Sequence, residues 1–272
     1  RMRPATRSVP KALLPIVDRP AVQYVVEEAI GAGVDEIVIV ADPDGVDLID
    51  RHFHGDGPLP GLQDVTIHVI AQPRPSGLGD AIARTAPLVG DRPFYCLLVD
   101  VVMPPGASAL TDLGVAAGPA GNSLAVRRVP MHLVPSVGVV EIRGRAGERI
   151  HDLAGAVEKP HPDEAPSDLG IVGRYLFQPE IFPLLDEVEP GHNGEVQLTD
   201  AIDTLARTSV CRSVTIGFDV LDVGTPRGYA EAWASLASAH PDWGRDYSAR
   251  MRPLAAEELA LIDLAQSVGL PS

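Results

Sequence analysis

The chain has 272 residues, and its 22 Lys and Arg against 37 Asp and Glu give a formal net charge of −15 and a pI near 4.8. So acidic a molecule repels DNA and RNA, which excludes nucleic-acid polymers as expected partners. The length suffices for one α/β core. Cys96 and Cys211 lack CxxC spacing, so we expect both to be buried thiols. Because the sequence shows no signal peptide and no apolar run of membrane length, we expect a cytoplasmic protein.

The first half of the chain alternates helical and extended patterns. Apolar spacing predicts helices over residues 21–33, 45–53 and 77–88, and continuous apolar runs predict strands over 36–41, 65–71 and 94–99. Strands that are apolar on both faces and alternate with helices are typical of a parallel sheet. This half is therefore predicted to form a parallel sheet covered by helices.

After Asn122 the pattern changes to short strands, predicted over residues 123–129, 137–142, 149–157 and 170–177. They follow one another through turns, as in antiparallel or mixed pairing. Helices over 180–188 and 196–208, a strand over 211–218 and a helix from Pro226 complete the pattern. The tail from Met251 carries scattered apolar residues that could pack on the body or on a second subunit. Together the elements predict one α/β domain.

Lys11 is the first candidate for a functional side chain, because it lies between Pro10 and Pro15. Each proline fixes its own φ and disfavours helix just before it, so we expect Lys11 on a stiff extended loop. A lysine held in this way is a point cation suited to a phosphate. Taken alone, an ordinary polar loop residue is the alternative.

Three further motifs follow predicted strands, where open parallel sheets bind their ligands. In the motif QPRPSGLGDA, Gln72 can pair with donor and acceptor edges of a base, and the glycines at 77 and 79 let the backbone approach a flat ligand. Asp100 and Asp222 each end a predicted strand, and such carboxylates suit Mg²⁺, which completes its shell with substrate phosphates. The alternatives are a tight glycine turn, a turn-forming Asp100 and an N-cap role for Asp222 before the helix at Pro226.

The third motif is Glu158-Lys159-Pro160, followed by SDLGIVGRYLF and NGEVQLTDAI. Glu158 can accept hydrogen bonds from sugar hydroxyls, and Lys159 can hold a sugar phosphate. As an isolated tripeptide, this segment would be a solvated turn.

These motifs, with RPATRSVPKALLPIVDRP at the start, resemble the bacterial UTP–glucose-1-phosphate uridylyltransferases (UDP-glucose pyrophosphorylases) of the sugar-nucleotidyltransferase superfamily. The resemblance runs from Arg1 to about Tyr229. In that family a strand and a glycine-rich phosphate loop precede the position of Arg1, so we expect both to be missing from the sequence as it stands.

The resemblance implies a Rossmann-like three-layer sandwich with a mixed, mainly parallel sheet of the nucleotide-diphospho-sugar transferase type. It implies a nucleotidyltransferase domain over residues 1–245, with a nucleotide-binding part to about 120 and a sugar-binding part over about 121–230. A C-terminal helical tail over 246–272 would follow. Such proteins are expected to form a homo-oligomer, either a dimer or a tetramer.

The resemblance also implies roles for individual residues. Arg1 and Lys11 would stabilise the developing pyrophosphate, and Lys159 would hold the attacking phosphate. Asp100 and Asp222 would bind Mg²⁺. The substrate contacts implied are Gln72 and Gly77 at the base, Glu158 at the sugar, and Gly138, Gly173 and Glu195 along the sugar pocket.

The sequence departs from the family pattern at Ser76, Asp80, Val99 and Val137, where the family usually has Lys, His, Pro and Tyr. Asp80 in place of a potential cation is expected to add repulsion near the triphosphate. The form QPxPxGL also resembles thymidylyltransferases, which allows some change at the base site.

The predicted activity is Mg²⁺-dependent transfer of uridylyl from UTP to glucose 1-phosphate, giving UDP-glucose and pyrophosphate. One alternative is the same chemistry with another base or sugar, such as dTTP. Another is a catalytically weak paralogue that binds sugar nucleotides and regulates a partner. A dinucleotide-dependent dehydrogenase is disfavoured because no predicted strand is followed by GxGxxG with a correctly spaced acidic residue.

Overall fold

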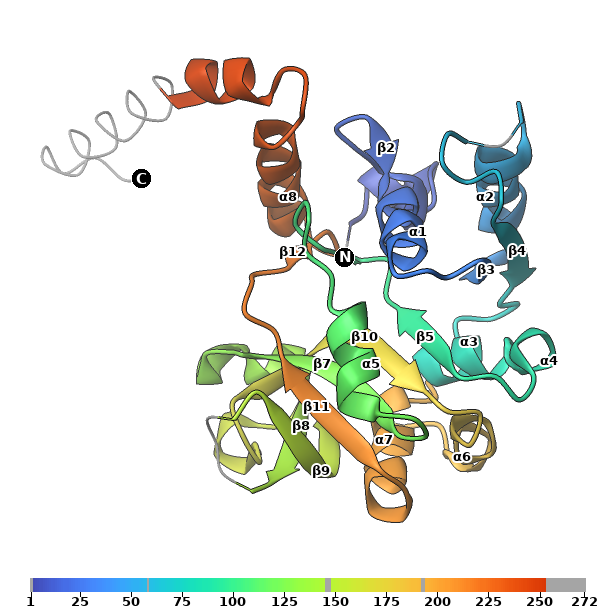
Figure 1. Ribbon diagram of the computed structural model, residues 1–272, viewed down its shortest axis with the longest axis vertical. Coiled ribbons are helices and arrows are strands. Elements are labelled where there is room, and N and C mark those ends of the chain that lie inside the picture. Colours follow the sequence, from blue (N-terminus) through green and yellow to red (C-terminus); the bar gives the residue numbers. More distant parts are fainter. Residues whose placement is uncertain (1, 58, 145–147, 192–193, 253–272) are drawn as a thin grey trace, which may run out of the picture.

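The computed structural model describes residues 2–57, 59–144, 148–191 and 194–252 (Figure 1). The labelled α-helices are α1 (Ala21–Gly31), α2 (Pro43–His54), α3 (Leu78–Ala83), α4 (Ala86–Val89), α5 (Leu110–Ala117), α6 (Ile181–Glu187), α7 (Leu198–Thr208) and α8 (Pro226–Ser238). Residues 244–252, within the predicted C-terminal tail for the most part, are also helical. Short 3₁₀ helices cover Ala5–Arg7, Lys11–Leu13, Met131–Ser136 and Pro162–Glu164. Within this part of the chain, no helix combines the length and apolarity needed to cross a membrane.

The strands are β1 (Pro15–Ile16), β2 (Arg19–Pro20), β3 (Glu36–Ala41), β4 (Thr66–Ala71), β5 (Phe94–Leu97), β6 (Val101–Val102), β7 (Asn122–Arg128), β8 (Gly138–Arg143), β9 (Ile150–Glu158), β10 (Leu169–Phe177), β11 (Cys211–Thr215) and β12 (Leu221–Asp222). The largest sheet has the order β5-β10-β7-β11-β9-β8, and β3 pairs separately with β4.

The sheet is mixed, as predicted, but parallel pairing does not dominate it. Of the strand pairs in the described residues, β3–β4 and β7–β11 are parallel. The antiparallel pairs are β5–β10, β7–β10, β8–β10, β9–β11, β8–β9, β1–β2 and β6–β12. A parallel neighbour requires a long crossover, usually a helix. The strands from β7 to β10 instead follow one another through turns and short 3₁₀ segments, so the expectation of a mainly parallel sheet is corrected here.

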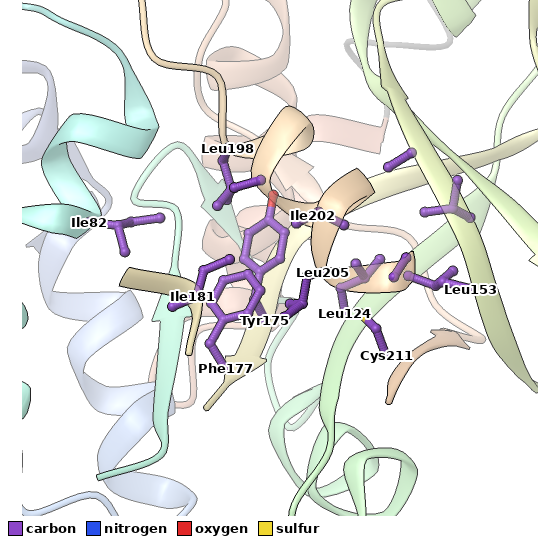
Figure 2. Close-up of a cluster of buried hydrophobic side chains, with 14 of the residues drawn as sticks. Ile82, Leu124, Leu153, Tyr175, Phe177, Ile181, Leu198, Ile202, Leu205 and Cys211 are labelled. Carbon is purple, nitrogen blue, oxygen red and sulfur yellow. The ribbon is translucent and has the colours of Figure 1, made fainter. Parts of the chain in front are cut away.

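Helices cover both faces of the large sheet, which gives the predicted three layers. Because successive side chains of a strand point to opposite faces, Leu124 and Val126 pack against α6 and α7, whereas Ala125 packs with the α5 side chains Leu110 and Leu113. Figure 2 shows the first of these clusters, with Tyr175 and Phe177 of β10 beside the α7 residues Ile202 and Leu205.

Both cysteines are free thiols, and Cys211 is buried in this first cluster. Burial raises the pKa of each thiol to about 12, so neither forms a reactive thiolate near neutral pH. The expectation of a buried thiol is confirmed for Cys211, whereas Cys96 is half-buried.

Two helices differ from the sequence prediction. The helix expected over 77–88 is divided into α3 and α4. Pro87, which lacks a backbone N–H, is accommodated at the start of α4, where no intrahelical bond is lost. The other helix, α5, has no counterpart among the predicted helices, because its internal Gly114 and small residues weaken its helical pattern.

An apolar cavity of about 670 Å³ lies between β3 and β5 and is also lined by α1 and α3. Its walls are mainly Val, Ile and Leu, and Lys11 and Arg92 are the cationic side chains on its lining. Lys11 therefore connects this cavity with the candidate site described below.

A buried ion pair connects α1, β10 and the turn that follows β5. Arg174 is 0% exposed, and its guanidinium lies 2.8 Å from the carboxylate of Glu28, whose side chain is 6% exposed. The same guanidinium donates to the carbonyl oxygens of Leu98 (3.1 Å) and Val101 (2.7 Å). These two carbonyls flank Asp100, so the pair holds that turn against the body of the protein.

We predict that Arg174→Met lowers the free energy of unfolding by about 3–5 kcal/mol, because Glu28 is left as an unpaired buried charge. The double variant Arg174→Met, Glu28→Met should recover part of this loss. Urea denaturation monitored by circular dichroism measures both values. Arg227→Met, which breaks an exposed pair with Glu231, is the control and should leave the stability nearly unchanged. Equal stability of Arg174→Met and the control would contradict this account.

Candidate active site

Lys11 and Asp100 meet although 89 positions separate them: Lys11 Nζ lies 2.7 Å from Asp100 Oδ2. Lys11 does not lie on the extended loop that was predicted, because it begins a single 3₁₀ turn. Pro10 is extended before this turn and Leu14, which precedes Pro15, is extended after it. The prolines therefore limit the helix to one turn and fix where Lys11 points.

Asp222 is brought to the same place by the short antiparallel pair β6–β12, in which Asp222 lies opposite Val101. The Val223 amide donates to the Asp100 carbonyl at 2.8 Å. A Cβ atom placed on Gly224 would lie 2.9 Å from Asp222 Oδ1, 3.2 Å from Lys11 Nζ and 3.3 Å from Asp100 Oδ2. The two predicted metal ligands and the predicted phosphate-binding lysine thus converge on one glycine.

The alternative roles of the aspartates can now be judged. Thr225, not Asp222, caps α8, because the Thr225 side chain accepts the Gly228 amide. Asp222 Oδ1 accepts the Gly224 amide at 2.7 Å. Asp100 does lie in a turn, closed by the Val101 amide on the Leu98 carbonyl, but its carboxylate is directed at Lys11. The N-cap alternative is wrong, and the turn position of Asp100 leaves its side chain available.

No group of three or more His, Cys, Asp or Glu side chains that could enclose a metal ion occurs in the described ranges. Mg²⁺ commonly takes only one or two carboxylates from the protein and fills its shell with water and substrate phosphates. The oxygen donors of Asp100 and Asp222 fit this requirement, and they do not fit a metal that needs a complete protein cage.

The second cluster forms where β8 and β9 pair, with Gly138 opposite Glu158. Glu158 accepts from Lys159 Nζ at 2.6 Å and from the Thr199 hydroxyl at 2.7 Å. A Cβ atom on Gly138 would lie 3.2 Å from both Glu158 Oε2 and Thr199 Oγ1, so a side chain there would crowd the carboxylate. Sequence reasoning missed Thr199, although it lies in the LTDAI motif that was singled out.

Gly173 has a local structural role beside the first cluster. Its φ of +79° suits glycine, and it lies where the pairing of β10 with β7 shifts register. A Cβ atom there would lie 2.9–3.1 Å from the side chain of Leu98, whose amide donates to the Gly173 carbonyl. Gly173 therefore allows the segment leading to Asp100 to approach β10.

Tyr175 of β10 is buried in the first hydrophobic cluster, and this burial raises the pKa of its phenol above the usual value. No direct contact joins the Lys11 and Glu158 clusters among the described side chains.

The third cluster contains Gln72, which directly follows β4, and the glycine turn before α3. Gln72 Nε2 donates to the Gly77 carbonyl at 2.9 Å and to Asp80 Oδ2 at 2.8 Å. Gly77, with φ of +99°, lies against the 195–196 backbone, because a Cβ atom there would be 2.6 Å from the Val196 carbonyl oxygen and 3.0 Å from Glu195 Cβ. The glycine thus permits a close approach of two protein segments and brings Glu195 beside the predicted base site.

Asp80 is not the unpaired negative charge that its departure from the family pattern suggested. Its carboxylate receives Arg84 Nε at 2.9 Å and Arg84 Nη2 at 3.0 Å. These hydrogen bonds, and then the one from Gln72, hold the pKa of Asp80 below its usual value despite partial burial. The expected repulsion is therefore offset locally by Arg84. Arg1, the remaining candidate, lies outside the described residues.

The family model of nucleotidyl transferases matches residues 1–239. The chain belongs to the nucleotidyl transferase family. It is similar to a UTP–glucose-1-phosphate uridylyltransferase of Streptococcus pyogenes, with 38% identity over 269 residues that cover 90% of this chain and 88% of the relative.

Solved structures give the same result. The chain is similar to a UDP-glucose pyrophosphorylase from Acinetobacter baumannii, with a TM-score of 0.83, 29% identity and coverage of 93% of this chain and 95% of that one. A UTP-bound form from the same organism gives a TM-score of 0.82 at 29% identity, covering 92% and 94% of the two chains. The resemblance seen in the sequence motifs and the predicted α/β fold class are both confirmed.

Proposed function

We propose that this member of the family transfers uridylyl from UTP to glucose 1-phosphate, giving UDP-glucose and pyrophosphate. The observation that carries the proposal is the convergence of Lys11, Asp100 and Asp222 on Gly224, from segments far apart in the sequence. Curated relatives that match nine-tenths of the chain bear the name of this activity, which supports the choice of substrates.

The reaction joins two anions. A phosphate oxygen of glucose 1-phosphate attacks the α-phosphorus of UTP, a new P–O bond forms, and the bond from the α-phosphorus to its bridging oxygen breaks. Pyrophosphate leaves with that electron pair, and no covalent enzyme intermediate forms. Such chemistry depends mainly on positioning and on neutralising charge, which this chain supplies with lysines.

Each cluster has a task in this proposal. Lys159 holds the sugar phosphate, while Glu158 accepts hydrogen bonds from sugar hydroxyls beside Gly138. Lys11, together with Arg1, stabilises the charge that develops on pyrophosphate. Gln72 reads the base. Gly173 and Glu195 shape the approach of the segments around the sugar.

Asp100 and Asp222 would hold a Mg²⁺ ion, which when bound supplies positive charge that neutralises phosphate oxygens. Lys11 Nζ already contacts Asp100 Oδ2 at 2.7 Å, so it partly neutralises this carboxylate in the protein itself. The aspartate pair therefore offers a cation site beside an ammonium group that a phosphate can attract.

The activity is tested directly by measuring pyrophosphate release from UTP and glucose 1-phosphate with Mg²⁺. Release that depends on both substrates, with UDP-glucose as the product, supports the proposal. Binding of UDP-glucose without turnover would overturn it and favour the regulatory paralogue. Replacing UTP by dTTP in the same assay separates the uridylyl from the thymidylyl reaction.

We predict that Asp100→Asn and Asp222→Asn each lower kcat on the order of 10²-fold, because the Mg²⁺ that would neutralise the reacting phosphates loses a charged ligand. Both changes should also weaken Mg²⁺ binding measured by calorimetry on the protein alone. Asp219→Asn removes an exposed carboxylate three positions from Asp222 and is the control. Full turnover and unchanged Mg²⁺ binding in Asp100→Asn would show that the metal assignment is wrong.

Gly224→Ala is predicted to lower kcat by up to about 10²-fold, since its Cβ would displace the three charged groups by a fraction of an ångström or more. Gly217→Ala is the control, because nothing lies within 4 Å of a Cβ atom there. Steady-state kinetics of both variants, with thermal unfolding to verify the fold, provides the test. Similar kcat values in the two variants would contradict the assignment of this glycine to the site.

The proposed function also implies how the chain is divided into substrate-binding parts. We propose a nucleotide-binding part to about residue 120 and a sugar-binding part over about 121–230, within a domain of 1–245. Of the proposed tail over 246–272, the part from residue 253 onward lies outside the described residues. Formation of a homo-oligomer and a cytoplasmic location stay predictions.

A further inference from the structure

The side-chain amide of Gln72 is held in one orientation. Its Nε2 atom donates to the Gly77 carbonyl at 2.9 Å and to Asp80 Oδ2 at 2.8 Å. The Gln72 backbone amide also donates, to the Ala41 carbonyl at 2.7 Å, so the residue is anchored at both ends. An amide nitrogen has two hydrogens, and both are used here.

The opposite orientation of the amide is strongly disfavoured. It would turn Gln72 Oε1 toward the Asp80 carboxylate and the Gly77 carbonyl. All three groups are hydrogen-bond acceptors, so they would repel one another and none would be satisfied. In the structure, no described residue donates a hydrogen bond to Gln72 Oε1. Gln72 can therefore offer a ligand only an acceptor.

Asp80 is itself fixed on α3 by Arg84, which donates through Nε at 2.9 Å and Nη2 at 3.0 Å. Such a two-bond contact between guanidinium and carboxylate sets both the position and the charge of the carboxylate. The side chain of Asp80 is 21% exposed and that of Arg84 35% exposed, so water does not surround the pair fully. Arg84 thus fixes the Asp80 carboxylate, which in turn fixes the side-chain amide of Gln72.

We propose that Asp80, positioned by Arg84, determines base specificity by locking Gln72 as a hydrogen-bond acceptor. The proposal rests on the proposed function, in which Gln72 reads the base. The base selected is a pyrimidine that carries a hydrogen on ring N3, as uracil and thymine do. Cytosine presents an unprotonated acceptor at N3, so two acceptors would face each other and the ring would be disfavoured.

The fixed Gln72 amide distinguishes bases by whether ring N3 donates or accepts a hydrogen bond. It does not contact the 5-methyl group by which thymine differs from uracil. It therefore separates UTP from CTP but does not separate UTP from dTTP. An unsatisfied acceptor in a partly buried site corresponds to about tenfold or more in affinity. Asp80 acts through Gln72 and is a positioning residue.

The test compares the affinities of the purified chain for UTP, dTTP and CTP with Mg²⁺ by isothermal titration calorimetry. We expect the wild-type protein to bind UTP at least about tenfold more tightly than CTP, with dTTP close to UTP at this contact. In Asp80→Ala only the Gly77 carbonyl still favours the original amide orientation, so the ratio of CTP to UTP dissociation constants should fall, by up to about tenfold. If this variant does not fold, Asp80→Asn replaces it, because its amide can donate to a reversed Gln72 and the ratio should fall as well.

Asp203→Ala is the matched control, since Asp203 forms the same kind of pair with Arg207 one helical turn along α7. It should leave the ratio unchanged. A wild-type protein that binds CTP as tightly as UTP, or a ratio unchanged in a folded Asp80 variant, overturns this inference even if pyrophosphate release is observed. Selective UTP binding without pyrophosphate release supports the inference and overturns only the proposed activity.

Discussion

The buried contact between Arg174 and Glu28 is the constraint on which the proposed site depends. The Arg174 guanidinium donates hydrogen bonds to the Leu98 and Val101 carbonyls, on either side of Asp100. Its carboxylate partner, Glu28, lies on α1, which follows the Lys11 segment. A fully buried arginine is costly unless all its donors are used, so this arrangement tolerates little movement. The position of Asp100 relative to Lys11 is thereby tied to the packing of the whole molecule.

Charge explains how an acidic protein can bring two anionic substrates together. Lys11 lies on Asp100 and Lys159 lies on Glu158, so each proposed phosphate-binding cation is held by a neighbouring carboxylate. These pairs are partly exposed, where ion pairs contribute little to stability. A phosphate can therefore draw each ammonium group away at small cost. The negative charge of Asp100 and Glu158 is therefore neutralised locally by these two lysines.

Much of the fold and site could be predicted because the informative patterns are local. Asp100, Asp222 and the Glu158-Lys159 motif were recognised in the sequence. Asp100, however, lies in the turn after β5, and β12, which carries Asp222, was not predicted. The convergence on Gly224 and the role of Thr199 could not be predicted, because each depends on contacts between distant segments. The sheet contains more antiparallel pairs than predicted for the same reason, since an apolar strand does not specify the direction of its neighbour.

The backbone at Lys159 has one more consequence. In a regular strand, adjacent side chains point to opposite faces, so an acid and a base next to each other in sequence could not serve one ligand. Lys159 has a φ of +46°, a left-handed conformation that ends the strand and turns its side chain back onto Glu158. Two consecutive side chains thereby face the same side, as the proposed contacts to a sugar and to its phosphate ester require.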